Sequence, residues 1–77
     1  MINQQASPTQ DAILEFITDY KLAHDGNSPS HLEIARAINK PRGNVYRFLL
    51  AMAHRRIIAM EVGGKIALPG GRYIPPE

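Results

Sequence analysis

The stretch EIARAINKPRGNVYRFLL, residues 33–50, decides the fold because two apolar patterns of helical period meet there at a break. Ile34 and Ile38 belong to the first pattern, and the second starts a few residues after the break. Asn39 suits the left-handed end of a helix, and Pro41 disfavours helical geometry at the residue before it. The stretch therefore predicts two helices joined by a tight turn.

The helix before the turn is predicted over residues 31–38. Ser30 and Glu33 have the spacing of a capping box, in which each side chain bonds the backbone N–H of the other residue. The helix after the turn is predicted from about residue 42 to about residue 56. Its apolar stripe consists of Val45, Phe48, Leu49 and Met52, and the opposite side carries Arg47, Leu50 and His54.

A further helix is predicted upstream, starting near Pro8. Ser7 can cap it, and Gln10 can reach back to the cap. Its apolar stripe consists of Ile13, Phe16, Ile17 and Tyr20, and it ends before the helix-breaking residues 25–27. Asp11, Glu15 and Asp19 line another face, where they favour the helix dipole and solubility; a divalent metal is the alternative.

The pattern changes after Arg56. Residues 57–62 are rich in β-branched residues, Gly63 and Gly64 suit a two-residue turn, and residues 65–68 resemble a returning strand. We expect a domain over residues 1–68 and a tail over 69–77, in which residues 72–74 could add a third strand or pair two copies. The predicted fold is mainly α: a three-helix winged helix-turn-helix with a small C-terminal β-hairpin wing.

Charge is distributed unevenly along the 77 residues, which can fill one small core and contain no cysteine. Residues 1–33 carry one cation and five acids, a net charge of −4, whereas residues 34–77 carry eight cations and two acids, a net charge of +6. Six cations and no acid lie between residues 34 and 60, which favours a polyanionic partner over a merely solvated basic surface. With no membrane span or signal peptide in the sequence, we expect a cytoplasmic protein.

Two groups of residues resemble catalytic motifs, but neither fits the motif it resembles. Gly63, Gly64 and Lys65 lack the first glycine and the Ser or Thr of a phosphate loop. Asp25, Ser28 and His31 could be imagined as a triad, but they lie beside a helix start, where capping accounts for the serines. We therefore expect neither an enzyme nor a bound cofactor or metal.

Residues 28–58, SPSHLEIARAINKPRGNVYRFLLAMAHRRII, resemble the N-terminal winged helix-turn-helix domain of the LexA-type repressors, and the similarity extends to about residue 68. Residues 28–30 followed by 33–35 are its most specific part. The resemblance covers the DNA-binding half of that family, without its self-cleaving, dimerising C-terminal domain. It implies that the helix after the turn enters the major groove of DNA while the hairpin wing meets the flanking backbone.

The resemblance also implies the residues that face DNA bases: Arg42, Gly43, Asn44, Tyr46 and Arg47. Our candidates for phosphate contacts are Ser30, Arg36, Lys40 and Lys65. Three of these side chains could serve the fold instead of DNA: Asn44 could be a helix cap, Tyr46 could pack on the first helix, and Arg36 could pair with Glu33.

We therefore expect a sequence-specific regulator of transcription, a repressor that binds double-stranded DNA, with a homodimer on DNA as a further expectation and no membrane association. The alternative is a winged-helix protein-interaction module, such as an antirepressor, that docks through Tyr46, Leu50 and the hairpin. The sequence leaves the operator, the regulated genes, the sign of regulation and the oligomeric state open.

Overall fold

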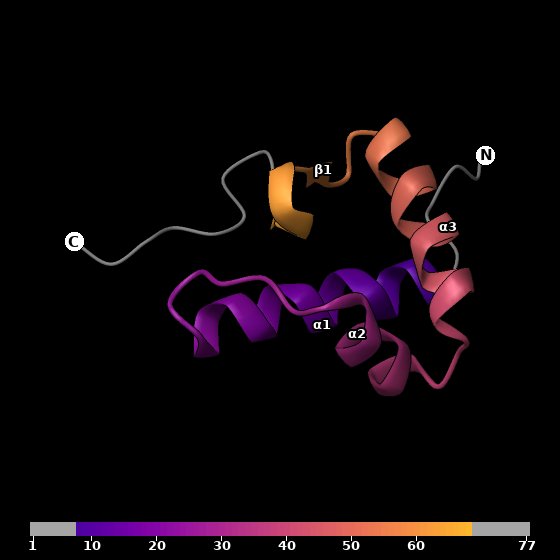
Figure 1. Cartoon of the computed structure of the whole chain (residues 1–77), viewed down its shortest axis with the longest axis horizontal. Helices are drawn as coiled ribbons and strands as arrows, with labels where there is room; N and C mark the ends of the chain where they lie inside the picture. Colours follow the sequence, from indigo (N-terminus) through magenta and orange to yellow (C-terminus); the bar gives the residue numbers. More distant parts are fainter. Residues whose placement is uncertain (1–7, 69–77) are drawn as a thin grey trace.

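The computed structural model describes residues 8–68. In chain order their elements are α1 (Pro8–Ala23), α2 (His31–Ile38), α3 (Arg42–His54), β1 (Ala59–Met60), the short 3-10 helix η1 (Val62–Gly64) and β2 (Ile66–Ala67) (Figure 1). Three helices followed by an antiparallel hairpin form a winged helix-turn-helix layout, which confirms the predicted fold class. We call the hairpin, residues 59–67, the wing.

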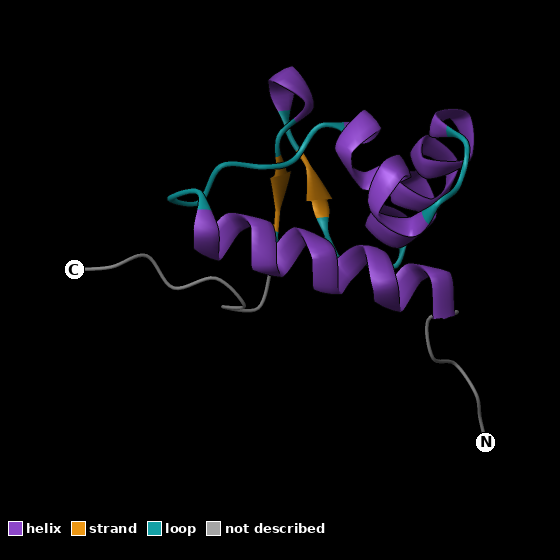
Figure 2. Ribbon diagram, turned by 90° about the horizontal axis from the view of Figure 1, so that it is seen from below, coloured by secondary structure: helices purple, strands orange, loops and turns teal. Residues whose placement is uncertain are grey.

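One core holds the helices and the wing together. Figure 2 shows the two strands and the other helices standing on one side of α1. The three helices and the segments around the wing contribute its buried apolar side chains. These are Ile13 and Ile17 from α1, Ile34 and Ala35 from α2, Val45, Leu49 and Met52 from α3, and Ile58, Ile66 and Leu68 around the wing. The predicted stripes of the helices face this core, with Phe16 and Phe48 half-buried at its edge. Tyr20 is the exception, because it lies outside the core and its hydroxyl bonds Glu33.

Local capping fixes the helix-turn-helix pair as the sequence predicts. The Ser30 hydroxyl accepts a hydrogen bond from the Glu33 N–H at 3.0 Å, and the Glu33 carboxylate accepts one from the Ser30 N–H at 2.7 Å. At the other end of α2, Asn39 adopts the left-handed conformation with φ 58°. The Lys40 N–H then bonds the Ala35 carbonyl at 3.1 Å, which closes the helix.

The wing differs from the prediction in its turn and in the length of its strands. Its register pairs Ala59 with Ala67 and Met60 with Ile66, so each strand has two residues. The predicted two-residue turn at Gly63 and Gly64 is wrong, because Val62 also belongs to the loop. The Gly64 N–H bonds the Glu61 carbonyl at 3.2 Å, and the φ of 80° at Gly63 is that of a type II turn, which favours glycine there.

Three predictions fall outside the described residues: the Ser7 cap, the tail over 69–77 and its third strand over 72–74. Within residues 8–68, no helix combines the length and the apolar character needed to cross a membrane.

Candidate nucleic-acid interface

Helix α3 exposes the side that sequence periodicity predicts. Val45, Leu49 and Met52 are fully buried. Because an α-helix advances about 100° per residue, Arg47 lies about 160° around the axis from Val45 and from Leu49. Packing of the buried stripe therefore aims Arg47 away from the core, and its side chain is exposed.

The start of α3 has a surplus of positive charge. Its N-cap is Pro41, which makes no side-chain cap, and its first turn contains no acid. The N–H groups of Arg42 and Gly43 have no hydrogen-bond partner within residues 8–68. The positive end of the helix dipole and the cation of Arg42 thus lie together without compensation by an acid. Asn44 lies inside the first turn, so its interpretation as the cap is wrong.

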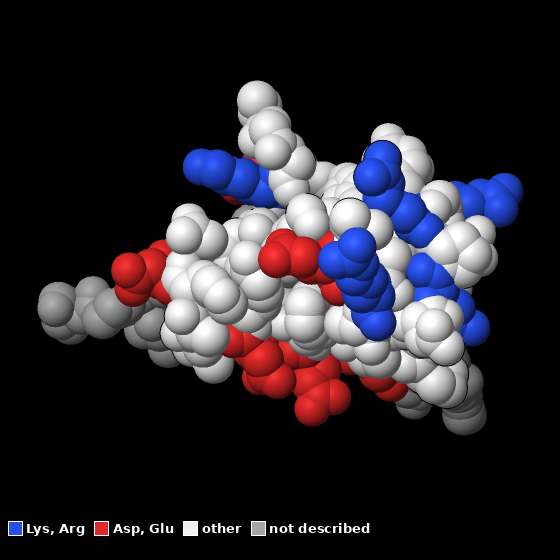
Figure 3. All heavy atoms as spheres, turned by 60° about the horizontal axis from the view of Figure 1, so that its bottom comes forward, with Lys and Arg blue, Asp and Glu red and all other residues white. Residues whose placement is uncertain are grey.

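The structure brings three of the predicted cations together around the α2–α3 turn. Arg36, Lys40 and Arg42 line one open groove of about 360 Å³. Their side chains make no ion pair with another residue of the described chain, so the predicted alternative of an Arg36–Glu33 pair is not formed. On the face that Figure 3 shows, most of the visible Lys and Arg side chains lie on the right, whereas several acids lie along the lower edge.

The candidates for base contacts occupy two sides of α3. Asn44 and Arg47 line a groove of about 380 Å³, to which Gln10 of α1 also contributes. The ring of Tyr46 lies on another side, 5.9 Å from the ring of His31, and 47% of Tyr46 is exposed. The aromatic contact of Tyr46 is therefore with α2, and not with α1, which the sequence left open as an alternative to contact with DNA.

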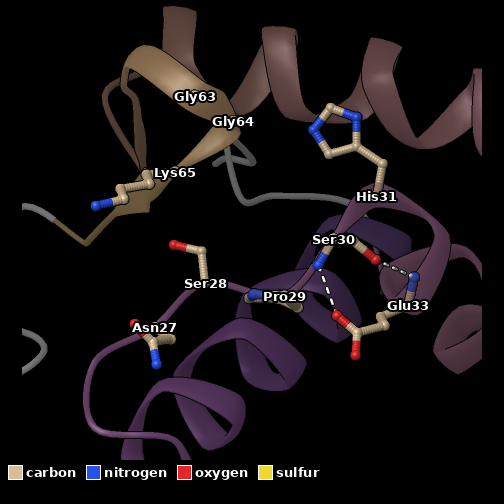
Figure 4. Close-up of a pocket in the computed structure, with 9 residues that line it drawn as sticks. All are labelled: Asn27, Ser28, Pro29, Ser30, His31, Glu33, Gly63, Gly64 and Lys65. Atoms are coloured by element: carbon tan, nitrogen blue, oxygen red, sulfur yellow. Dashed lines mark hydrogen bonds between the residues drawn. The ribbon is translucent and has the colours of Figure 1, made fainter.

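A third groove, of about 570 Å³, lies between the start of α2 and the wing (Figure 4). It brings together Ser30 and Lys65, two predicted phosphate contacts that are 35 positions apart in the sequence. The Ser30 hydroxyl accepts the capping hydrogen bond and can still donate its own hydrogen. His31 lines the same groove, and its Nε2 atom is buried without a hydrogen-bond partner within residues 8–68.

Two side chains at the capping box have shifted pKa values. The N–H of Ser30 stabilises the charged form of Glu33 and lowers the pKa of that carboxyl below its ordinary value. Tyr20 donates a hydrogen bond from its hydroxyl to Glu33 Oε2 at 3.3 Å. Partial loss of solvent, followed by the charge and the hydrogen bond of Glu33, raises the pKa of the Tyr20 hydroxyl. Glu33 therefore links α1 to the start of α2.

Two residues that matter to this surface were not predicted. The Ser28 hydroxyl bonds the backbone of Ile66 in the wing, so capping does not account for this serine. No local pattern signals a contact over 38 positions. Lys21 is only 8% exposed, and its ammonium donates to the Gly26 carbonyl at 2.9 Å. Its spacing of four from Ile17 was the available signal, because that spacing places Lys21 on the buried face of α1.

Comparison of the chain with protein-family models, with curated proteins and with solved structures found no match. The arrangement itself offers cations, free N–H donors and amide groups on an exposed helix, flanked by a turn and a wing. Such groups can bind phosphates and the edges of bases.

Proposed function

We propose that this protein is a cytoplasmic regulator of transcription that binds duplex DNA sequence-specifically through α3. The observation that carries the proposal is the exposed, unpaired cluster of Arg36, Lys40 and Arg42 beside the uncapped start of α3. Like charges held together without acids are stabilised by a polyanion, and the exposed part of α3 can enter a major groove. The resemblance of residues 28–58 to LexA-type domains supports repression as the outcome.

Each predicted residue has a role in this proposal. Ser30, Arg36, Lys40 and Lys65 contact phosphates on both sides of α3, and Arg42, Gly43, Asn44, Tyr46 and Arg47 face the bases. Arg47 carries the main discrimination because a guanidinium can bond both major-groove acceptors of guanine. No step of this function requires a catalytic residue, a cofactor or a metal.

One observation favours a second candidate, a protein-interaction module. Tyr46 and Leu50 are 47% and 46% exposed on adjacent turns of α3, and together they offer an apolar contact. A protein partner would bury both side chains and tolerate loss of Arg47, whereas DNA binding depends on Arg47 and its cationic neighbours.

Selection of bound duplexes from a random pool tests the proposed function and returns the site. We expect enrichment of a short motif that contains guanine, and we expect Arg47→Ala to abolish the enrichment at that guanine. Leu50→Ser is the matched variant for the alternative. A pool that stays random after repeated rounds, with a protein that remains folded, would overturn sequence-specific DNA binding.

A further inference from the structure

The loop before α2 is attached to the wing through one side chain. The hydroxyl oxygen of Ser28 accepts a hydrogen bond from the Ile66 N–H at 2.8 Å and donates one to the Ile66 carbonyl at 3.1 Å. Figure 4 places Ser28 directly beside the part of the wing that carries Lys65. A single hydroxyl thus satisfies both backbone groups of one strand residue.

The register of the wing explains why the N–H and carbonyl of Ile66 are not bonded to β1. Antiparallel pairs alternate between residues that exchange backbone hydrogen bonds and residues that do not. The Glu61 N–H bonds the Lys65 carbonyl at 2.7 Å, so the next pair, Met60 with Ile66, is of the second kind. The N–H and carbonyl of Ile66 therefore point away from β1, to the edge where a third strand would pair. Ser28 takes the place of that strand.

The loop that carries Ser28 is itself held in place on both sides. Upstream, the buried ammonium of Lys21 bonds the Gly26 carbonyl. Downstream, Pro29 is fully buried and Ser30 caps α2. Ser28 thus connects the edge of the wing to the rigid start of α2, and not to a loose loop.

The neighbour of Ile66 in the wing is the exposed Lys65, which shares a groove with Ser30. We infer that Ser28 is a positioning residue for DNA binding: its hydroxyl fixes the edge of the wing relative to α2, so that Lys65 reaches a phosphate while α3 lies in the major groove. The inference rests on the proposed function and adds a residue that does not itself contact DNA. Apolar burial of Ile66 keeps the wing on the core without Ser28, but leaves its edge free to shift.

A double-mutant cycle on DNA affinity tests the coupling. When Ser28 is present, Lys65→Ala should lower the affinity for the duplex by a measurable factor. In a Ser28→Ala background, the factor by which Lys65→Ala lowers the affinity should be smaller by at least about twofold. Ser28→Cys, which keeps the size of the side chain but bonds weakly, should reduce the factor in the same way. Thr18→Ala is the matched control, because it removes a part-buried hydroxyl that bonds Leu14 within α1; the factor should be unchanged there.

Amide hydrogen exchange tests the contact without DNA. The Ile66 N–H should be protected in the natural protein and should lose that protection in both Ser28 variants. An equal Lys65→Ala factor with and without the Ser28 hydroxyl, or unchanged protection of Ile66, would overturn the inference while the proposed function stands. Failure of the natural protein to bind any duplex would overturn the proposed function and the inference together.

Discussion

Arg47 and Lys40 are both exposed cations, but the structure holds them differently. Arg47 extends from the middle of a helix whose opposite side is buried, so packing fixes the direction in which its side chain leaves the molecule. Lys40 lies in the α2–α3 turn, where a flexible ammonium can follow a phosphate. The cation at Arg47 should therefore discriminate between sequences, whereas the cation at Lys40 should only strengthen binding.

We predict that Arg47→Ala removes preference for a guanine, worth about 1–3 kcal/mol of discrimination, and leaves non-specific binding largely intact. Lys40→Ala should weaken binding to all duplexes nearly equally. Titrations of both variants on selected and scrambled duplexes, at one salt concentration, make the comparison. If Arg47→Ala lowers the affinity for both duplexes by the same factor, Arg47 is another phosphate contact.

Gly43 lies in the first turn of α3, where the fold does not require a glycine. Its φ is not positive, and no heavy atom beyond its own neighbourhood lies within 4 Å of where a Cβ would stand. Gly43→Ala should therefore raise the free energy of unfolding by about 0.5–1 kcal/mol. If the start of α3 approaches DNA closely, the same methyl group should weaken duplex binding.

Urea unfolding and duplex titration of Gly43→Ala measure the two effects separately. Ala51→Gly, on an exposed position of the same helix, is the control that should lower stability. A Gly43→Ala variant that is more stable and binds DNA with unchanged affinity would show that DNA does not approach Gly43.

The start of α2 depends on charge at Glu33. Since the hydrogen bond from the Ser30 N–H lowers the pKa of Glu33 in the folded state, this carboxylate contributes stability above its ordinary pKa. That contribution is lost as pH falls through the folded pKa, which lies below 4.5. The natural protein should therefore lose more stability between pH 6 and pH 3 than Glu33→Gln does.

Urea midpoints of both proteins at several pH values in this window check the prediction. Glu15→Gln is the control, because Glu15 is exposed on α1 and its carboxylate makes no hydrogen bond with another described residue. Parallel pH profiles of the natural protein and Glu33→Gln would contradict the role of this carboxylate.

The elements that the sequence predicted well are those whose signals are local. Ser30 pairs with Glu33 three positions later, and Asn39 ends α2 through a bond to Ala35, four positions earlier. The wing turn was mispredicted because Val62, with no turn preference of its own, joins the loop and is 94% exposed. The end of α3 was predicted near residue 56 and lies at His54, because Arg56 adopts the left-handed conformation that glycine usually takes.

The candidate site was predicted only in part, because only some of its residues are placed by local signals. Periodicity placed Arg47 opposite the buried stripe, and the break at Pro41 placed Lys40 in the turn. Ser30 and Lys65 line one groove because the wing folds back over the start of α2. That arrangement depends on tertiary packing and on the Ser28 contact, which no spacing in the sequence reveals.

At the scale of the molecule, one small domain offers little interface. A single module of this kind buries only about 600–1,000 Å² on DNA, which seldom gives tight specific binding. We therefore predict two copies on each selected duplex, in two half-sites. Analytical ultracentrifugation of the protein with and without duplex measures the stoichiometry, and a strict 1:1 complex on every selected site would contradict a paired arrangement.

The charge distribution of the whole molecule gives the most direct test of DNA binding by this surface. Five exposed cations surround the proposed interface: Arg36, Lys40, Arg42, Arg47 and Lys65. If three to five of them release counterions from phosphates, log affinity should fall with log salt at a slope of roughly −3 to −4.5 per domain. Alanine at both Arg36 and Lys65 should make that slope shallower by about 2.

The decisive measurement is therefore the affinity of the natural protein and of the Arg36→Ala, Lys65→Ala variant for one selected duplex over a series of salt concentrations. We expect two straight lines on logarithmic axes, the steeper one for the natural protein. An affinity that does not change with salt, or equal slopes for the two proteins, would contradict the account of this surface as a DNA-binding interface.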